Sequence, residues 1–180
     1  MKAWSHFCTI AHHKKLVMQG CFRVGLYKQG ILHDMSKYSP SEFLIGCKYY
    51  QGNRSPNNAE REDKGLSTAW LHHKGRNKHH YEYWIDYAVG TDDMVGMLMP
   101  KKYVVEMFMD RIAASKTYQK EKYTDSSALR YYQSGVANYV IHEKTKKLLE
   151  KLLIMLAESG EDVTFQYIRE HVLNSEDYEE

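Results

Sequence analysis

The sequence has little of what marks secreted, membrane or disulfide-linked proteins. It has three cysteines in 180 residues, an odd number, and none of them forms a CxxC pair. Each lies among apolar residues, where a reduced cysteine behaves as a small hydrophobic side chain. No apolar run approaches the roughly 20 residues of a membrane span, and the first fifteen residues carry His and Lys where a signal peptide needs an apolar core. We therefore expect a reduced, cytoplasmic protein with no membrane partner.

Several common catalytic motifs are missing as well. The sequence contains no GxSxG serine motif, no glycine-rich phosphate loop and no HExxH zinc motif. A cysteine nucleophile is disfavoured, because Cys8, Cys21 and Cys47 lie in apolar surroundings that favour the neutral thiol. The formal net charge of only +2 gives no electrostatic reason to expect a nucleic-acid partner. The composition, with 43% hydrophobic and 27% charged residues, is that of one globular domain.

Apolar residues recur mainly at the spacing of helices, which predicts an all-α fold in a single domain over 1–174, followed by an acidic, frayed tail at 175–180. Ser39, Pro40 and Glu42 predict a helix start with a capping box closed by the Glu42 side chain. Alternation over 81–87 suits a short strand, and 90–93 reads as a turn. The expected helical segments are 4–27, a compact piece beginning at 31–35, 40–51, 60–73, 100 onward, 126–140, 143–158 and 165–173.

The distribution of histidines is the main chemical signal. Eight of the ten fall between His6 and His80, including three adjacent pairs. A single histidine on an apolar helix face is most often a satisfied core residue. Several of them together with inward carboxylates form the neutral imidazole and carboxylate set that binds divalent transition metals.

Two positions favour such a site. His13 falls on the apolar face of its helix, four residues before Val17, whereas His12 points elsewhere. Asp110 occupies an inward position among core residues, and a buried carboxylate needs a cation, a salt bridge or a metal. An ion pair from Asp110 to an arginine such as Arg23 or Arg130 is the alternative to a metal.

The spacing of these residues resembles the H…HD…D signature of the HD superfamily, which is carried here by His13, by the pair His33-Asp34 and by Asp110. Two segments are also similar to an uncharacterised bacterial and phage family with HD-like features: LHDMSKYSPSEF and AWLHHKGRNKHHYEYW. The resemblance implies an HD-like helical bundle in which these four residues bind metal. It further implies that Asp34 can bridge two ions and that Lys37 faces a substrate phosphate.

The segment between residues 72 and 80 suggests a second metal position. Metal-dependent HD hydrolases carry extra histidines in this interval, and the analogy assigns His73 and His80, with His79 as a further candidate. His73 follows the apolar Ala69-Trp70 face, which favours an inward role for it over His72. The alternative is a solvated basic loop that contacts anions without metal. The Gly-Tyr-Pro signature of the cyclic-dinucleotide branch is absent, which argues against such substrates.

Together these features predict a metal-dependent phosphohydrolase that acts on a small phosphorylated substrate, such as a nucleotide. One or two divalent ions, chosen among Mn, Fe, Co, Ni and Zn, would activate water. Lys37, Arg76 and Arg111 would neutralise the phosphate. Asp34, Lys37 and a free histidine, His79 or His72, would complete the catalytic set. Two alternatives to an enzyme are a metal- or nucleotide-binding protein without turnover and a structural role for the histidines. The sequence is also compatible with a homo-oligomer.

Overall fold

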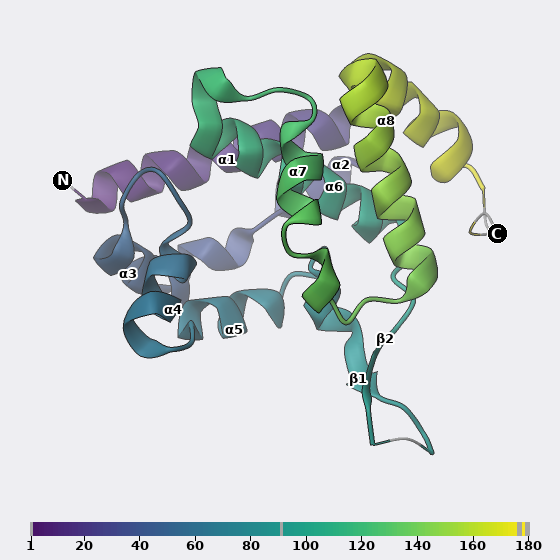
Figure 1. Cartoon of the computed structure of the whole chain (residues 1–180). Helices are drawn as coiled ribbons and strands as arrows, with labels where there is room; N and C mark the ends of the chain where they lie inside the picture. Colours follow the sequence, from purple (N-terminus) through teal and green to yellow (C-terminus); the bar gives the residue numbers. More distant parts are fainter. Residues whose placement is uncertain (1, 91, 176–177, 179–180) are drawn as a thin grey trace.

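Helices make up nearly all of the regular structure in the computed structural model, which describes residues 2–90, 92–175 and 178 (Figure 1). The three longest are α1 (Lys2–Arg23), α6 (Lys101–Gln119) and α8 (Glu143–Tyr167). The shorter helices are α2 (Tyr27–Leu32), α3 (Pro40–Tyr49), α4 (Pro56–Lys64), α5 (Thr68–Lys74) and α7 (Ser127–Gln133). Single helical turns are η1 (Met35–Tyr38), η2 (Tyr81–Trp84), η3 (Lys120–Lys122), η4 (Val136–Asn138) and η5 (Ile168–Val172). The prediction of an all-helical single domain is confirmed.

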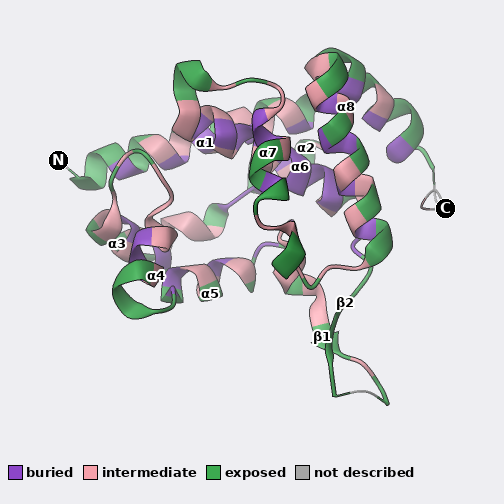
Figure 2. Ribbon diagram, viewed as in Figure 1, coloured by how far each residue is buried: buried purple, intermediate pink, exposed green. Residues whose placement is uncertain are grey.

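The core lies where α6 packs between α1 and α8. In Figure 2 the buried residues gather on the facing sides of these helices. Helix α6 is buried almost all round, and Val104, Val105 and Phe108 have no exposed surface. Burying each such side chain contributes roughly 1.5–3 kcal/mol relative to leaving it in water. The central helix is therefore firmly held, and its polar residues are fixed in space with it.

Several predicted helix boundaries were wrong. The expected helix over 60–73 is two helices, because Gly65 adopts a left-handed conformation (φ 76°) that ends α4, and the Ser67 side chain caps the start of α5. The expected helix over 126–140 ends at Gln133, before Gly135. These glycine and serine signals are present in the sequence, and the apolar periodicity obscured them.

The predicted capping box does not form. Ser39 makes no side-chain cap hydrogen bond, and the Glu42 carboxylate contacts the rings of His72 and His73 instead. The compact helical piece expected from residue 31 is also interrupted: α2 ends at Leu32, and η1 starts at Met35. His33 and Asp34 lie in the connection between them.

A β-hairpin extends away from the helices (Figure 1). It pairs β1 (Ile85–Tyr87) with β2 (Met94–Gly96) in antiparallel register, so the short strand expected within 81–87 is confirmed for its last three residues. Thr91, in the predicted turn, lies outside the described residues, as do four of the six residues of the predicted tail. Within the described part of the chain, no helix combines the length and apolar character that a membrane crossing requires.

Replacing Glu60 with Gln should lower the free energy of unfolding by about 1–3 kcal/mol, because this fully buried carboxylate accepts hydrogen bonds from Ser67 and Thr68 at the start of α5. Burial acts to raise the pKa of Glu60, but these hydrogen bonds lower it from 4.5 to about 2. The contribution is therefore present above pH 4.5 and lost as the pH falls towards 2. In urea unfolding, the difference between the two proteins should shrink on acidification. Equal stability at neutral pH would contradict this role.

Candidate metal centre

The turn that carries His33 and Asp34 has an uncommon backbone. Asp34 adopts a left-handed conformation with φ 55° and ψ 26°, a region that asparagine and aspartate enter more readily than other residues with a Cβ atom. As a result both side chains turn inward, and His33 and Asp34 are each only 1% exposed. A strained backbone at a buried charge is typical of a functional site.

Lys14 of α1 holds this turn in place. Its Nζ atom donates to the carbonyl oxygens of Ile31, at 2.7 Å, and of His33, at 2.8 Å. These carbonyls lie at the end of α2, where a cation also interacts favourably with the helix dipole. The turn is thereby fixed against the helix that carries His13.

One oxygen of Asp34 faces the four-residue group that the sequence predicted. Its Oδ2 atom lies 3.2 Å from His33 Nε2 and 3.6 Å from His13 Nε2. The Oδ1 atom of Asp110 lies 2.9 Å from His13 Nε2 and 3.4 Å from His33 Nε2. Residues from α1, the His33-Asp34 turn and α6 therefore bring ligand-type atoms within 4.8 Å of one another. This group, His13, His33, Asp34 and Asp110, could hold a metal ion; we call it the first group.

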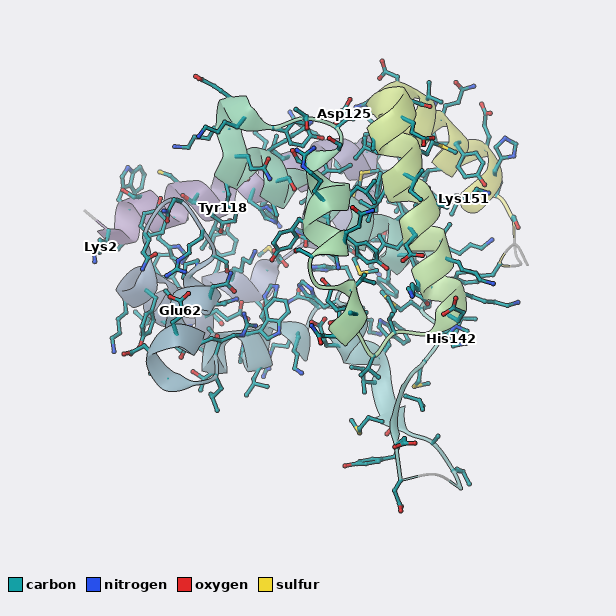
Figure 3. All side chains as sticks on the ribbon, viewed as in Figure 1. Lys2, Glu62, Tyr118, Asp125, His142 and Lys151 are labelled. Atoms are coloured by element: carbon teal, nitrogen blue, oxygen red, sulfur yellow. The ribbon has the colours of Figure 1, made fainter. Side chains whose placement is uncertain are left out.

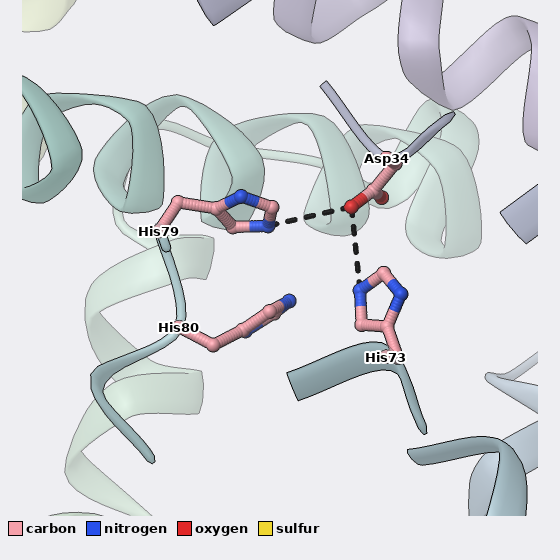
Figure 4. Close-up of side chains that lie close together, drawn as sticks. All are labelled: Asp34, His73, His79 and His80. Carbon is pink, nitrogen blue, oxygen red and sulfur yellow. Dashed lines mark ion pairs between the residues drawn. The ribbon is translucent and has the colours of Figure 1, made fainter. Parts of the chain in front are cut away.

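The other oxygen of Asp34 faces a second set of imidazoles, drawn in Figure 4. Its Oδ1 atom lies 3.3 Å from His73 Nε2 and 3.4 Å from His79 Nε2. The ring of His80 lies beside them, 4.8 Å from His73 and 4.2 Å from His79 between centroids. These residues, Asp34, His73, His79 and His80, form a second group that could hold an ion. Asp34 belongs to both groups, one oxygen to each.

The atoms facing these two spaces lack good partners within the protein. Five buried atoms make no hydrogen bond of acceptable geometry: Nε2 of His13, His33, His79 and His80, and Oδ1 of Asp34; Asp34 Oδ2 faces the Lys37 ammonium at 2.6 Å. An unsatisfied buried polar atom costs roughly 1–3 kcal/mol, and such atoms are rare in native structures. Their convergence on two points, with nitrogen and oxygen donors, fits divalent transition ions.

Two outer carboxylates set the orientation of the imidazoles. Glu106, one helical turn before Asp110, lies 2.9 Å from His33 Nδ1 and 3.2 Å from His79 Nδ1. Glu42 lies 2.8 Å from His73 Nδ1. A carboxylate at Nδ1 keeps the proton there and leaves Nε2 free as a ligand, an arrangement common around protein-bound metals. Glu106 was not predicted from the sequence, although Glu106 and Asp110 share a helix face at four-residue spacing.

The charges of the cluster are coupled. Burial would raise the pKa of Asp34, but His33 and Lys37 hold it well below its usual range. Burial, followed by the nearby rings of His79 and His73, keeps the pKa of His80 well below its usual value. The Lys37 ammonium lies 2.6 Å from Asp34 Oδ2. The centre therefore holds an ionised Asp34 beside a neutral His80 imidazole.

Neither arginine considered as a partner of Asp110 lies beside it. Arg23 forms ion pairs with Glu161 and Asp162, and Arg130 donates to Ser and Thr oxygens of its own turn, so neither neutralises Asp110. The solvated-loop interpretation of 72–80 is also wrong at two positions, since His73 and His79 are each 2% exposed.

A cavity of about 510 Å³ opens beside the cluster. Its lining includes His13, His73, His80 and Asp110, together with the cationic side chains of Lys37 and Arg111. Arg76, predicted to face a substrate phosphate, is exposed and lies outside this lining, as does His72. The cavity has the size of sites that bind small organic ligands.

Comparison with known proteins gives a family but no activity. No curated protein and no solved structure matches the chain. A family model described as a family of unknown function, DUF5662, matches residues 2–155. That range covers most of the chain and contains every residue of both groups. The protein belongs to the DUF5662 family.

Proposed function

We propose that this protein is a metal-dependent phosphohydrolase that cleaves a small phosphate ester. One observation carries the proposal: the two oxygens of Asp34 face two separate sets of imidazole nitrogens beside a cavity. The first group consists of the residues on which the resemblance to the HD superfamily rests. The metal-binding, HD-like interpretation is therefore supported by how these residues converge.

The donor set suits one or two divalent ions, with Asp34 shared between them. His13, His33 and Asp110 would complete the first position, and His73, His79 and His80 the second. Bound there, a transition metal would supply a nucleophile at neutral pH by lowering the pKa of water towards about 7. Mn, Fe, Co, Ni and Zn all accept such mixed nitrogen and oxygen ligands.

We assign phosphate binding to two cations. Lys37 and Arg111 both line the cavity next to Asp110. The Arg111 guanidinium lies over the ring of Tyr132, 5.4 Å from its centroid, and its Nε atom is buried without a hydrogen-bond partner. Fixed cations of this kind stabilise negative charge that develops on the phosphoryl oxygens. Because Arg76 lies outside the cavity, we assign this role to Lys37 and Arg111 alone.

We assign His79 to the metal rather than to proton transfer. Its Nδ1 atom faces Glu106, and its Nε2 atom faces Asp34, so both nitrogens are committed within the cluster. His72, the other candidate, is not part of the cavity lining, and its Nδ1 atom lies 2.6 Å from Glu42. Neither histidine faces the space in which a leaving group would lie.

Purified protein reconstituted with Mn, Co or Zn should bind up to two ions per chain, measured by elemental analysis, and should hydrolyse members of a phosphate-ester panel. His13→Ala and Asp34→Asn should lose metal and reduce turnover by at least about a hundredfold, because removing such a group costs several kcal/mol of charge stabilisation. His12→Ala is the matched control, since this neighbouring histidine is exposed. Metal-free protein after reconstitution, with activity unchanged in Asp34→Asn, would refute the metal site. Bound metal without turnover would favour a metal- or nucleotide-binding protein.

Glu106→Gln should weaken metal binding by about tenfold to a hundredfold, because the charged acceptor for two ligand imidazoles is removed. Competition with a chromophoric chelator measures this affinity. Glu62→Gln serves as the control, because Glu62 is an exposed carboxylate whose partner is Arg54. Affinities that agree within error for Glu106→Gln and the wild type would exclude this role.

Lys37→Gln should lower kcat by about a hundredfold while the protein retains its metal, because the substitution removes a charge from the phosphate and no ligand from the centre. Steady-state kinetics on the best panel substrate, with metal content measured on the same samples, tests the two effects separately. If the loss of metal accounted for the whole loss of activity, Lys37 would instead act by holding Asp34 in position.

A further inference from the structure

The cavity continues beyond the metal centre to a second end that the proposed chemistry does not use. Residues 53–58, which connect α3 to α4 and begin α4, line it there. Arg61 of α4 and Trp70 of α5 also contribute to the lining. Glu62 of α4, which follows this region in the chain, is labelled in Figure 3. The charges of the side chains at this end indicate which charge a ligand bound there would carry.

Arg61 is a cation without an anionic partner. Its guanidinium lies 5.3 Å from the centroid of the Trp70 ring, and its Nη1 atom donates to the Asn58 side chain at 2.8 Å. Among the residues that the structure describes, no carboxylate lies within ion-pair distance of Arg61. A guanidinium offers five N–H donors, so a stacked arginine with one donor used retains most of its capacity for an anion.

Arg54, the other arginine of this region, is different. Its two terminal nitrogens each lie 2.5 Å from an oxygen of Glu62, and its Nε atom donates to Gln51. This pair is bidentate, and the charge of Arg54 is already compensated. Arg54 therefore serves as a matched control for Arg61.

The start of α4 also favours an anion, through the positive end of its helix dipole. Pro56 takes the first helical position, and Ser55 makes no side-chain cap hydrogen bond. Ser55 and Asn57 line the cavity, so the positive end of the helix dipole faces the same space. Free N–H groups at such an end bind anions.

His6 supplies a buried polar atom to the same cavity. It is 7% exposed, lines the cavity, and its Nδ1 atom has no hydrogen-bond partner. Its ring lies 5.5 Å from that of Tyr50, the residue that follows α3 and leads towards the lining segment. Burial, with the nearby charge of Lys37, lowers the pKa of His6 to about 4, so the ring is neutral and can donate one hydrogen bond.

We propose that Arg61, the start of α4 and His6 form a second anion subsite, so that the substrate carries a negatively charged group at the end remote from the phosphate that is cleaved. The inference rests on the proposed hydrolase function for its substrate assignment. The expected substrates are phosphate esters that carry a second phosphate or a carboxylate. Esters with neutral or purely apolar leaving groups are disfavoured.

The kinetic test compares alkanediol bisphosphates of increasing chain length with the matching monophosphates, using the metal-reconstituted protein. For the best chain length, kcat/KM should be at least about tenfold higher for the bisphosphate, the effect of one charge-assisted hydrogen bond. Arg61→Gln should bring this ratio to about one, whereas Arg54→Gln should leave it unchanged. Asn57→Asp, which adds a negative charge to the subsite, should also abolish the preference and provides a second variant. Equal kcat/KM values in the wild type, or a ratio that Arg61→Gln does not change, would overturn the subsite.

A binding test separates this inference from the proposed reaction. Titration of metal-free protein with inorganic phosphate, followed by calorimetry, should give a dissociation constant that Arg61→Gln raises at least about tenfold. Arg54→Gln should not change it. If no ester is hydrolysed but this dependence on Arg61 is found, the proposed function fails and the anion subsite stands. If wild-type protein binds no phosphate, or Arg61→Gln binds it equally, the subsite is refuted whatever the turnover.

Discussion

The buried carboxylate of Asp34 is the constraint on which the rest of the site depends. At 1% exposure an ionised group must be compensated on every side, and here each oxygen faces its own pair of imidazoles while Lys37 approaches one of them. The left-handed backbone at Asp34, held by Lys14 of α1, presents both oxygens inward. The fold around the turn therefore acts mainly to hold one charge in one orientation.

The first group could be predicted from the sequence because its members carry independent local signals. His13 lies on an apolar helix stripe, and Asp110 stands where a carboxylate needs a partner. Both helices are long, regular and packed together, so the spacing of their apolar residues correctly predicts which face points inward. The all-helical class followed from the same periodicity. The resemblance to a known motif then linked these positions to His33 and Asp34, which lie in a connection and have no periodic signal of their own.

The remainder of the site could not be read in the same way. Glu42 carries the signature of a capping box, yet its carboxylate faces His72 and His73, because two imidazoles brought close by the fold compete with the local backbone for the same acceptor. His79 and His80 lie in a segment without helical period, and only the fold determines which nitrogen meets Asp34. Local sequence determines where a helix can start; which partner a side chain finally bonds depends on contacts far along the chain.

The two groups differ in how they are held, and Glu106 joins them. The first draws on α1 and α6, whose contact is part of the core, whereas the second draws on the end of α5 and the segment that follows it. The start of α5 is held by the buried carboxylate of Glu60, which lies outside the cluster. Glu106 accepts at Nδ1 of both His33 and His79, so one side chain of the central helix sets the free nitrogen of a ligand in each group. Glu106 thereby links the second group to α6, the helix with the most buried residues, and a change at Glu106 would affect both groups at once.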